Sequence, residues 1–220
     1  LFRSLSECAA WYAGHVEQWR TLAAPLRSDA TSPSAGDELI LYQALLGSWP
    51  LDLHLDDQPA LEAYQQRLWQ WQQKALREAK LQSSWSAPNE AYEQGVETFL
   101  TRLLLSDAGR ALRTSIGAAA QAIAPAGALN GLAQSLLRVT VPGVPDLYQG
   151  DEFWDFSLVD PDNRRPVDFN ARQRALETLP DMGELLFNWH DGRIKQALIA
   201  QVLALRKAHP EVFHRGSYTD

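Results

Sequence analysis

The sequence of 220 residues has one cysteine, Cys8, which excludes an internal disulfide bond and a zinc site built from several thiolates. Its five histidines are scattered without metal-ligand spacing, so we expect neither a metal nor a cofactor. No apolar run reaches the roughly 20 residues of a membrane-spanning helix, and no signal-peptide pattern is recognisable. Basic residues form no block, which argues against nucleic acid or a membrane as a partner. By elimination we expect a cytoplasmic protein.

Tryptophan, in contrast, is abundant, with eight residues in a chain whose net charge is −7. A tryptophan ring fills a core well, and its flat faces can also stack on sugar rings. Core filling accounts best for most of the eight. The tryptophans that we expect to be packing residues are Trp11, Trp19, Trp69 and Trp71.

Apolar residues recur at helical spacing along most of the chain, and a composition of 45% hydrophobic and 21% charged residues is typical of a folded core. The clearest helix follows Pro59 and carries one apolar stripe over about five turns. We expect this stripe to pack against a helix at residues 89–105, around Phe99 and Leu103. The stripe consists of Leu61, Tyr64, Leu68, Trp71, Ala75 and Ala79.

A short β-branched run at residues 136–141 ends at Pro142 and favours a buried parallel strand. One strand cannot build a sheet, so this strand would belong to a larger sheet. Leu1 also stands in the middle of a helical pattern, and together these features predict a piece of a longer protein. The unpaired strand edges would favour dimerisation or re-pairing of the isolated chain.

The segment after this run, residues 142–168, is dense in proline, aspartate, arginine and aromatic residues. A loop of this length is uncommon in a compact domain unless it is functional. We therefore expect it to line a site.

Two consecutive segments carry a family resemblance. Residues 141–152 (VPGVPDLYQGDE) resemble the eighth barrel strand and following loop of the α-amylase superfamily, glycoside hydrolase family 13. Residues 153–168 (FWDFSLVDPDNRRPVD) are more specific and are similar to the maltooligosyl trehalose synthase family, the (1→4)-α-D-glucan 1-α-D-glucosylmutases. The resemblance covers nearly the whole chain, excepting a loop near residues 26–36. Further matches lie at residues 78–80, 84–93 and 127–134.

The resemblance implies an intramolecular glucosyl transferase that converts the reducing-end α-1,4 bond of a maltooligosaccharide to an α,α-1,1 bond. In this retaining chemistry an aspartate nucleophile forms a glycosyl-enzyme, and a glutamate acts as acid and base. The released glucose turns in its subsite and attacks in place of water. The family's catalytic carboxylates would precede Leu1, so none is assigned to this chain, which alone should be inactive.

The fold implied is mainly α, with a helical insert domain and the last strand, loop and helices of an incomplete (β/α)8 barrel. A C-terminal β-domain would begin near Tyr218. The expected divisions are residues 1–25 (the helix following barrel strand 7), 26–125 (the inserted helical domain), 126–170 (the last barrel helix, strand 8 and its active-site loop) and 171–220 (the closing helices).

Four candidate residues follow from the resemblance or from the barrel geometry. Lys80 and Trp85 are implied to hold the turning glucose, one as a hydrogen-bond donor and the other as a stacking face. A lysine at a helix C-terminus is also explained by the helix dipole. Tyr148 and Gln149 follow the predicted strand, where the groups of a barrel active site gather, and are candidates for lining the pocket.

The motif at residues 160–166 combines carboxylate, amide and guanidinium groups, which can bind sugars through fixed hydrogen bonds. The alternative is an Asp–Arg network that holds the loop closed. The candidate substrate-binding residues of this motif are Asp160, Asn163, Arg164 and Arg165.

Two further polar segments have structural interpretations. Asp151 and Glu152 are adjacent, so in an extended chain they point to opposite sides and make a poor catalytic pair. We expect them to orient loop backbone or arginine side chains. Residues 188–191 (NWHD) precede Gly192, and this composition favours a turn.

Two alternatives to the proposed family stay open. One is another α-glucosidic hydrolase or transferase of the same superfamily, against which the motif at residues 160–168 argues. The other is a non-catalytic helical binding module. Activity on a maltooligosaccharide, the expected partner, separates these alternatives.

Overall fold

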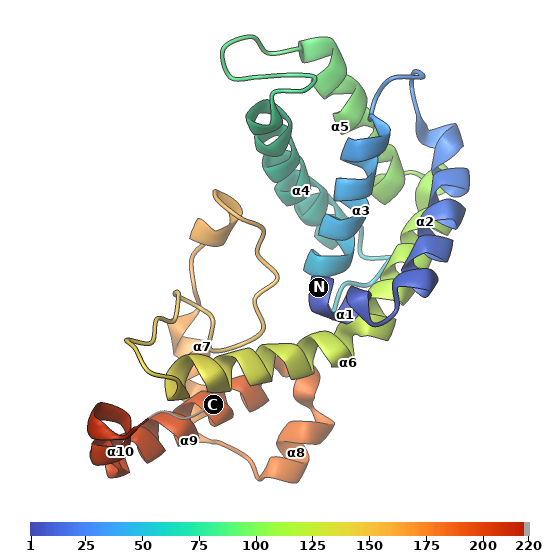
Figure 1. Cartoon of the computed structure of the whole chain (residues 1–220). Helices are drawn as coiled ribbons and strands as arrows, with labels where there is room; N and C mark the ends of the chain where they lie inside the picture. The colour runs from blue at the N-terminus through green and yellow to red at the C-terminus, as the bar shows by residue number, and fades with distance from the viewer. Residues whose placement is uncertain (218–220) are drawn as a thin grey trace. The chain divides into compact units, whose positions relative to one another are not determined.

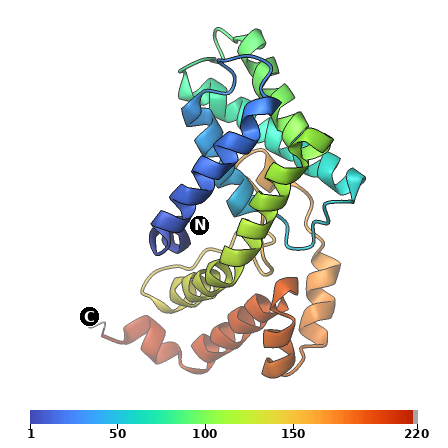
Figure 2. The ribbon, with the colours of Figure 1, turned by 90° about the vertical axis from the view of Figure 1, so that its right-hand side faces the viewer.

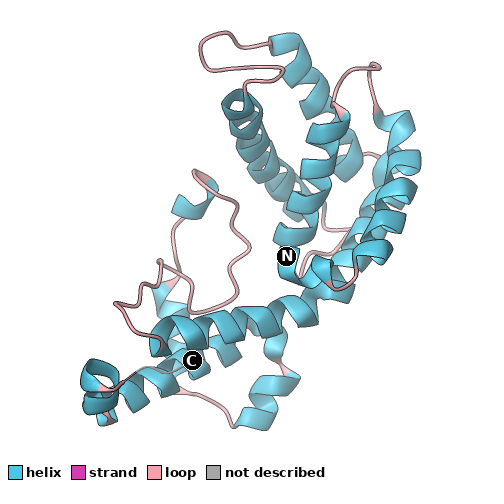
Figure 3. Ribbon diagram, in the orientation of Figure 1, coloured by secondary structure: helices cyan, strands magenta, loops and turns pink. Residues whose placement is uncertain are grey.

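The computed structural model describes residues 1–217, and within that range the regular structure is entirely helical (Figure 1; Figure 3). The mainly α fold class is therefore confirmed. The chain divides into two compact units: unit 1 is Leu1–Ala124 with Phe156–Arg165, and unit 2 is Pro125–Asp155 with the residues from Pro166 onward.

Unit 1 contains the candidate residues Lys80 and Trp85 and those of the motif at residues 160–165. Its elements are α1 (Phe2–Ser6), α2 (Ala9–Ala23), η1 (Ala24–Leu26), α3 (Ala35–Ser48), α4 (Gln58–Ala79), α5 (Glu90–Leu105), η2 (Asp107–Gly109), the first part of α6 (Arg110–Thr140) and η3 (Asp162–Arg164).

The pair α4 and α5 forms where the sequence predicts it, and side chains cap both N-termini. Asp57 accepts a hydrogen bond from the Ala60 N–H at 3.1 Å, and Asn89 accepts one from the Tyr92 N–H at 3.2 Å. Each bond satisfies a donor that a helix leaves unpaired in its first turn. The α4–α5 loop between these helices is visible at the top of Figure 1.

The apolar stripe of α4 packs as expected over its central turns, whereas Ala79 is exposed and Leu76, outside the predicted stripe, is buried instead. Tyr64 and Leu68 share one buried core with Phe99 and Leu103 of α5, and Trp71 packs against it while partly buried. The expected packing role of the tryptophans is also confirmed. Trp19 is fully buried, and Trp11 and Trp69 lie partly buried against the same core.

Unit 2 has a smaller core, in which Leu185, Ile194 and Ala197 are buried and Trp154 and Trp189 pack beside them. Figure 2 shows α9 and α10 toward the red end of the chain. The elements of unit 2 are the second part of α6, α7 (Phe169–Glu177), α8 (Met182–Phe187), η4 (Trp189–Asp191), α9 (Arg193–Ala208) and α10 (Pro210–Arg215).

The expected strand at residues 136–141 is wrong, because α6 continues to Thr140. A strand needs hydrogen-bond partners on a neighbouring strand, and residues 1–217 contain none, whereas a helix satisfies its backbone internally. The Val139 carbonyl, near the helix end, accepts a hydrogen bond of 2.6 Å from Arg206 Nη1. The expectation of a dimer loses the strand edge on which it rested and stays a prediction.

Two other expectations differ in outcome. Residues 188–191 form a turn, as predicted: η4 ends at Asp191, and the φ of 80° at the following Gly192 lies in the left-handed region that glycine adopts readily. The expected start of a β-domain near Tyr218 lies outside the described residues, and the four expected divisions of the chain remain predictions.

Candidate functional site

The predicted site residues of unit 1 lie on two loops that meet the same helix. One is the loop at residues 156–165, which packs on α4, and the other is the α4–α5 loop at residues 80–89. Lys74, which anchors the first loop, is six residues from Lys80, a separation of about 9 Å along a helix axis. α4 thus presents both groups of candidate residues.

Arg67 of α4 anchors the 156–165 loop through a bidentate ion pair with Asp162. Its Nε and Nη2 atoms donate to the two carboxylate oxygens at 2.9 Å each, and Nη2 also donates to the Phe156 carbonyl at 2.9 Å. The Leu158 N–H donates to the same carboxylate at 2.8 Å. Such paired, charge-assisted bonds are directional, so they fix the path of the loop.

The Asp162 side chain is only 4% exposed, which makes its charge dependent on these partners. Burial alone would raise the pKa of Asp162, but the hydrogen bonds from Arg67 and the Leu158 N–H outweigh it and hold that pKa below its ordinary value. Arg165 adds a contact of 3.0 Å between its Nε and Oδ1 of Asp162. The Asp–Arg network that holds the loop closed is therefore present, and Arg165 belongs to it.

The other residues of this motif differ in how many of their hydrogen-bonding groups already have a partner within the protein. Lys74 Nζ donates to the Asp160 carbonyl at 2.9 Å and to its carboxylate at 3.3 Å, and Arg164 pairs with the same carboxylate. The Arg164 side chain is 72% exposed. The side-chain oxygen of Asn163 is buried and has no hydrogen-bond partner within the described part of the chain. Arg164 therefore keeps exposed donors for a ligand, and Asn163 keeps one unpaired acceptor, which is buried.

The α4–α5 loop places Lys80 and Trp85 at the surface. Lys80 ends α4 in a left-handed conformation with φ of 57°, and its side chain is exposed. Trp85 is 58% exposed, and the Arg77 guanidinium carbon lies 5.0 Å from the centroid of its ring. The loop thus exposes both a flat ring and a rotatable ammonium donor.

The buried carboxylate of Glu93 on α5 lies beneath this loop. It accepts two hydrogen bonds from Arg77, at 2.8 and 2.7 Å, one from Ser83 Oγ at 2.5 Å and one from Gln73 Nε2 at 3.1 Å. The bond from Arg77 is the main cause that lowers the pKa of Glu93 to about 2, and those from Ser83 and Gln73 add to it. Glu93 is therefore ionised throughout the neutral range.

Tyr148 and Gln149 lie in unit 2 on an exposed turn, in which the Asp151 N–H donates to the Tyr148 carbonyl at 3.1 Å. The following residues contact arginines, as their structural interpretation predicts. Arg172 Nε donates to Glu152 at 3.0 Å, and Arg138 Nη1 lies 3.9 Å from the Asp151 carboxylate. The two adjacent carboxylates are thus held apart by different partners.

A lysine completes the support of this segment. Lys195 Nζ donates to the Phe153 carbonyl at 3.2 Å and lies 5.9 Å from the Trp154 ring. Burial lowers the pKa of Lys195 and raises the pKa of Asp151. Burial thus disfavours the charged forms of both Lys195 and Asp151, and nearby opposite charges act against this effect.

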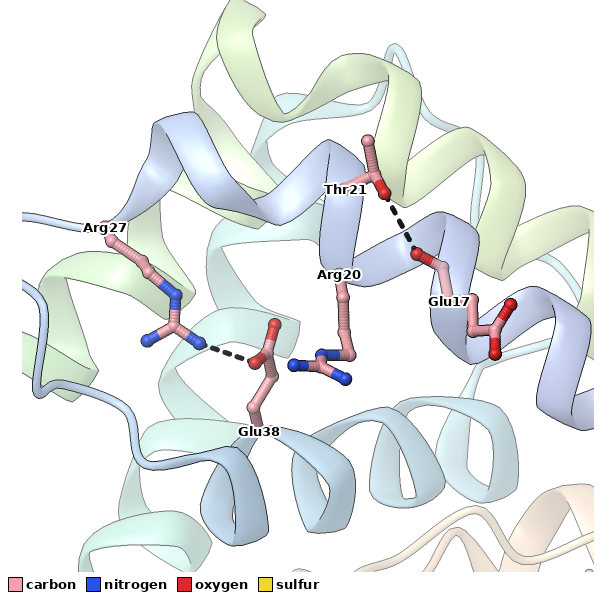
Figure 4. A pocket seen from close by; sticks show the side chains of 5 residues that line it. All are labelled: Glu17, Arg20, Thr21, Arg27 and Glu38. Carbon is pink, nitrogen blue, oxygen red and sulfur yellow. Dashed lines mark hydrogen bonds and ion pairs between the residues drawn. The ribbon is translucent and has the colours of Figure 1, made fainter.

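A separate cavity of about 480 Å³ in unit 1 contains none of the predicted residues (Figure 4). Its most buried lining residue, Glu38, is satisfied by Arg27 Nη2 at 2.5 Å and Tyr42 Oη at 2.6 Å. Figure 4 shows the Arg20 side chain directed toward Glu38. The lining residues are Glu17, Arg20, Thr21, Arg27 and Glu38.

Neither a metal site nor a membrane span is found among the residues that the structure describes. No group of three or more histidine, cysteine, aspartate or glutamate side chains there could hold a metal ion. No helix in that part of the chain is both long and apolar enough to cross a membrane.

Sequence reasoning did not single out the residues that anchor the two loops, namely Arg67, Lys74, Arg77 and Glu93. The three cations lie at spacings of seven and three on α4, which places them along one side of the helix. That polar stripe was the available signal. Its partners are up to 95 residues away in sequence, and no local pattern identifies them.

No family model matches the chain. Two curated proteins from Mycobacterium tuberculosis strains CDC 1551 and H37Rv are each 38% identical over 200 residues, which is 91% of this chain and 23% of those proteins. A crystal structure superposes with a TM-score of 0.83 at 31% identity, covering 96% of this chain and 27% of that one. A structure from Sulfolobus tokodaii gives a TM-score of 0.77 at 31% identity, covering 96% and 26%.

The chain is thus homologous, along nearly its whole length, to a segment of one class of synthase. The name that both curated relatives and both structures share is maltooligosyl trehalose synthase. The chain spans about a quarter of the length of these proteins. The family resemblance stated from the sequence is therefore confirmed.

Proposed function

We propose that the chain forms part of an enzyme that converts the reducing-end α-1,4 bond of a maltooligosaccharide to an α,α-1,1 bond. The observation that carries this proposal is the 38% identity to maltooligosyl trehalose synthases over 91% of the chain. Membership of glycoside hydrolase family 13 and a cytoplasmic location are parts of the proposal.

In this proposal unit 1 supplies the groups that keep the released glucose. Trp85 offers an exposed ring, and Lys80 offers an ammonium group whose donors rotate with the sugar. Arg164 and Asn163 supply further hydrogen bonds from the loop that Arg67 anchors on α4. The support is that these side chains are exposed or unsatisfied on loops that are themselves fixed.

Asp160, Arg165, Tyr148 and Gln149 have weaker support as sugar ligands. The Asp160 carboxylate is shared by Lys74 and Arg164, and Arg165 is bound to Asp162. Tyr148 and Gln149 are exposed in unit 2, and we keep them as pocket residues on the resemblance alone.

The catalytic carboxylates are proposed to lie outside this chain, which then has no activity alone. A double displacement needs two facing carboxyl groups about 5 Å apart, each free to react. Asp151 and Glu152 do not meet this need, because Glu152 is bound to Arg172 and Asp151 faces Arg138.

The test is product analysis of the complete product of the gene that encodes this chain, acting on maltopentaose. We expect reducing ends to disappear without an equal release of glucose, because the bond is moved and not hydrolysed. The chain alone, at equal concentration, is expected to leave maltopentaose unchanged. A gain of reducing ends with each bond broken would identify a hydrolase, and turnover by the chain alone would contradict the assignment of catalysis to other residues.

A further inference from the structure

The loop that carries Lys80 and Trp85 is tied down by residues that lie behind it. We propose that Arg77 and Glu93 are positioning residues that hold the Trp85 ring with one face covered and the opposite face open to a glucose ring. The inference rests on the proposed function, because the ligand is the glucose of that subsite.

The centre of this arrangement is the Glu93 carboxylate, which is 95% buried. Both of its oxygens accept from Arg77, so the guanidinium is held in one plane relative to α5. The remaining acceptor positions are filled by Ser83 and Gln73. A buried carboxylate with this many donors has one low-energy arrangement, and its neighbours share that order.

Ser83 carries the constraint into the loop. Its hydroxyl donates to Glu93, and the same oxygen accepts a hydrogen bond of 3.0 Å from the Asn89 N–H. Asn89 in turn caps α5. Between these anchors, the Ser84 N–H and the Ala87 carbonyl close a turn at 3.3 Å. Both ends of the segment that presents Trp85, at Ser83 and at Asn89, are therefore linked through the Ser83 hydroxyl.

The Arg77 guanidinium is the part of this network that meets the ring. Its carbon lies 5.0 Å from the ring centroid of Trp85, within the range of a cation–π contact. The contact occupies one face of the indole, and 58% of the residue remains exposed. A ring that is already fixed loses less rotamer freedom when a sugar stacks on it than a mobile ring does.

A purely structural ion pair would produce the same hydrogen bonds, so the test needs a readout specific to glucose retention. The complete gene product is assayed on a short maltooligosaccharide, and the ratio of trehalose-ended product to free glucose is measured. Arg77→Met removes both the positive charge and the paired guanidinium donors to Glu93, whereas Arg77→Lys keeps the charge. Arg110→Met is the matched control, because Arg110 is an exposed arginine of another ion pair in the same unit. Trp85→Ala is the reference.

We expect Arg77→Met to lower the ratio about threefold to tenfold, in the direction of Trp85→Ala, while kcat for bond breaking changes less. Arg77→Lys should recover part of the ratio, and Arg110→Met should leave it unchanged. A wild-type ratio in Arg77→Met, with a lowered ratio in Trp85→Ala, would overturn the positioning role of Arg77 and leave the proposed role of Trp85 intact. An unchanged ratio in Trp85→Ala would overturn the proposed role of Trp85 and the inference with it.

A second measurement keeps the inference testable if Arg77→Met fails to fold. Glu93→Gln weakens the same network from the opposite side, and hydrogen exchange of residues 83–89 reports the order of the loop. We expect exchange in this segment to rise about tenfold. Wild-type exchange there would show that the loop does not depend on Glu93 and would overturn the inference.

Discussion

At the scale of single residues, the two loops on α4 depend on two buried carboxylates, Asp162 and Glu93. Each is more than nine-tenths buried and accepts a paired hydrogen bond from an arginine of α4. A buried carboxylate without its cation retains most of the desolvation cost, so these arginines matter more than exposed ones do. The loops should therefore respond to substitutions that do not touch a ligand.

Glu93 makes a pH-dependent contribution to stability. Its pKa falls from an ordinary 4.5 to about 2 in the fold, so the contribution is complete above pH 4.5 and is lost as the pH falls toward 2. We expect Glu93→Gln to lower the free energy of unfolding by about 1–3 kcal/mol at pH 7, and by less than half as much at pH 3. Denaturant unfolding of the chain at both pH values measures this. Glu62→Gln, at an exposed position of α4, is the control.

An equal loss at pH 7 and pH 3 would mean that the Glu93 charge does not contribute to the stability of the fold. The control variant should change stability by less than about 0.5 kcal/mol at either pH, as surface substitutions usually do.

The Arg67–Asp162 pair should show an asymmetry. Arg67→Met leaves the buried carboxylate with only the more exposed Arg165 as its cation and is expected to cost about 3 kcal/mol. Asp162→Asn keeps an acceptor for the Leu158 N–H and leaves a charge on the more exposed partner, so we expect it to cost about 1–3 kcal/mol. Unfolding free energies of the two variants test this order, and a larger loss in Asp162→Asn would contradict it.

At the scale of elements, the sequence predicted α4 and α5 well and residues 136–141 badly. The α4 stripe has a period of 3.6 over many turns, and side-chain caps mark both helices, so local information is sufficient. The run around Val139 has β-branched residues, but strand propensity depends on neighbours. Within residues 1–217 no strand is present to pair with it, and the α6 helix continues instead.

The sequence identifies the candidate loops because their motifs are specific. It does not identify the residues that anchor these loops. Asp160 to Arg165 stand out as a cluster of polar groups between prolines. The pairing of Asp162 with Arg67 joins residues 95 positions apart, and packing in three dimensions decides it. Pairings of this kind are why the role of Arg165 could be stated from the sequence only as one of two alternatives.

The main core of unit 1, to which α2, α4 and α5 all contribute, allows a graded test. Trp71 is partly buried against the shared core, whereas Trp19 is fully buried and donates to Ser115 Oγ at 2.9 Å. We expect Trp71→Ala to cost about 2–3 kcal/mol and Trp19→Ala about 3–5 kcal/mol. Denaturant unfolding compares them. A Trp71→Ala variant as stable as the wild type would show that this part of the stripe does not stabilise the pair.

At the scale of the whole molecule, the chain is two units, and it passes between them within α6 and again at each end of residues 156–165. The first of these passages falls between Ala124 and Pro125 of α6, where a proline removes one backbone donor from the helix interior. Unit 1 contains the loops proposed to hold glucose, and unit 2 contains the segment at residues 148–155 with its own supporting cations. Each unit therefore carries part of the resemblance to the synthases.

The central claim is that Lys80 and Trp85 keep the freed glucose until it attacks the glycosyl-enzyme. Its most direct test is the ratio of trehalose-ended product to free glucose formed by Lys80→Ala and Trp85→Ala in the complete gene product. Weakening the grip by about 1.4 kcal/mol should shift this ratio about tenfold toward glucose, because water then competes with a glucose that leaves. We expect that shift, with a smaller change in the rate of bond breaking. An unchanged ratio with a uniformly lower rate would show that both side chains are structural and would contradict the claim.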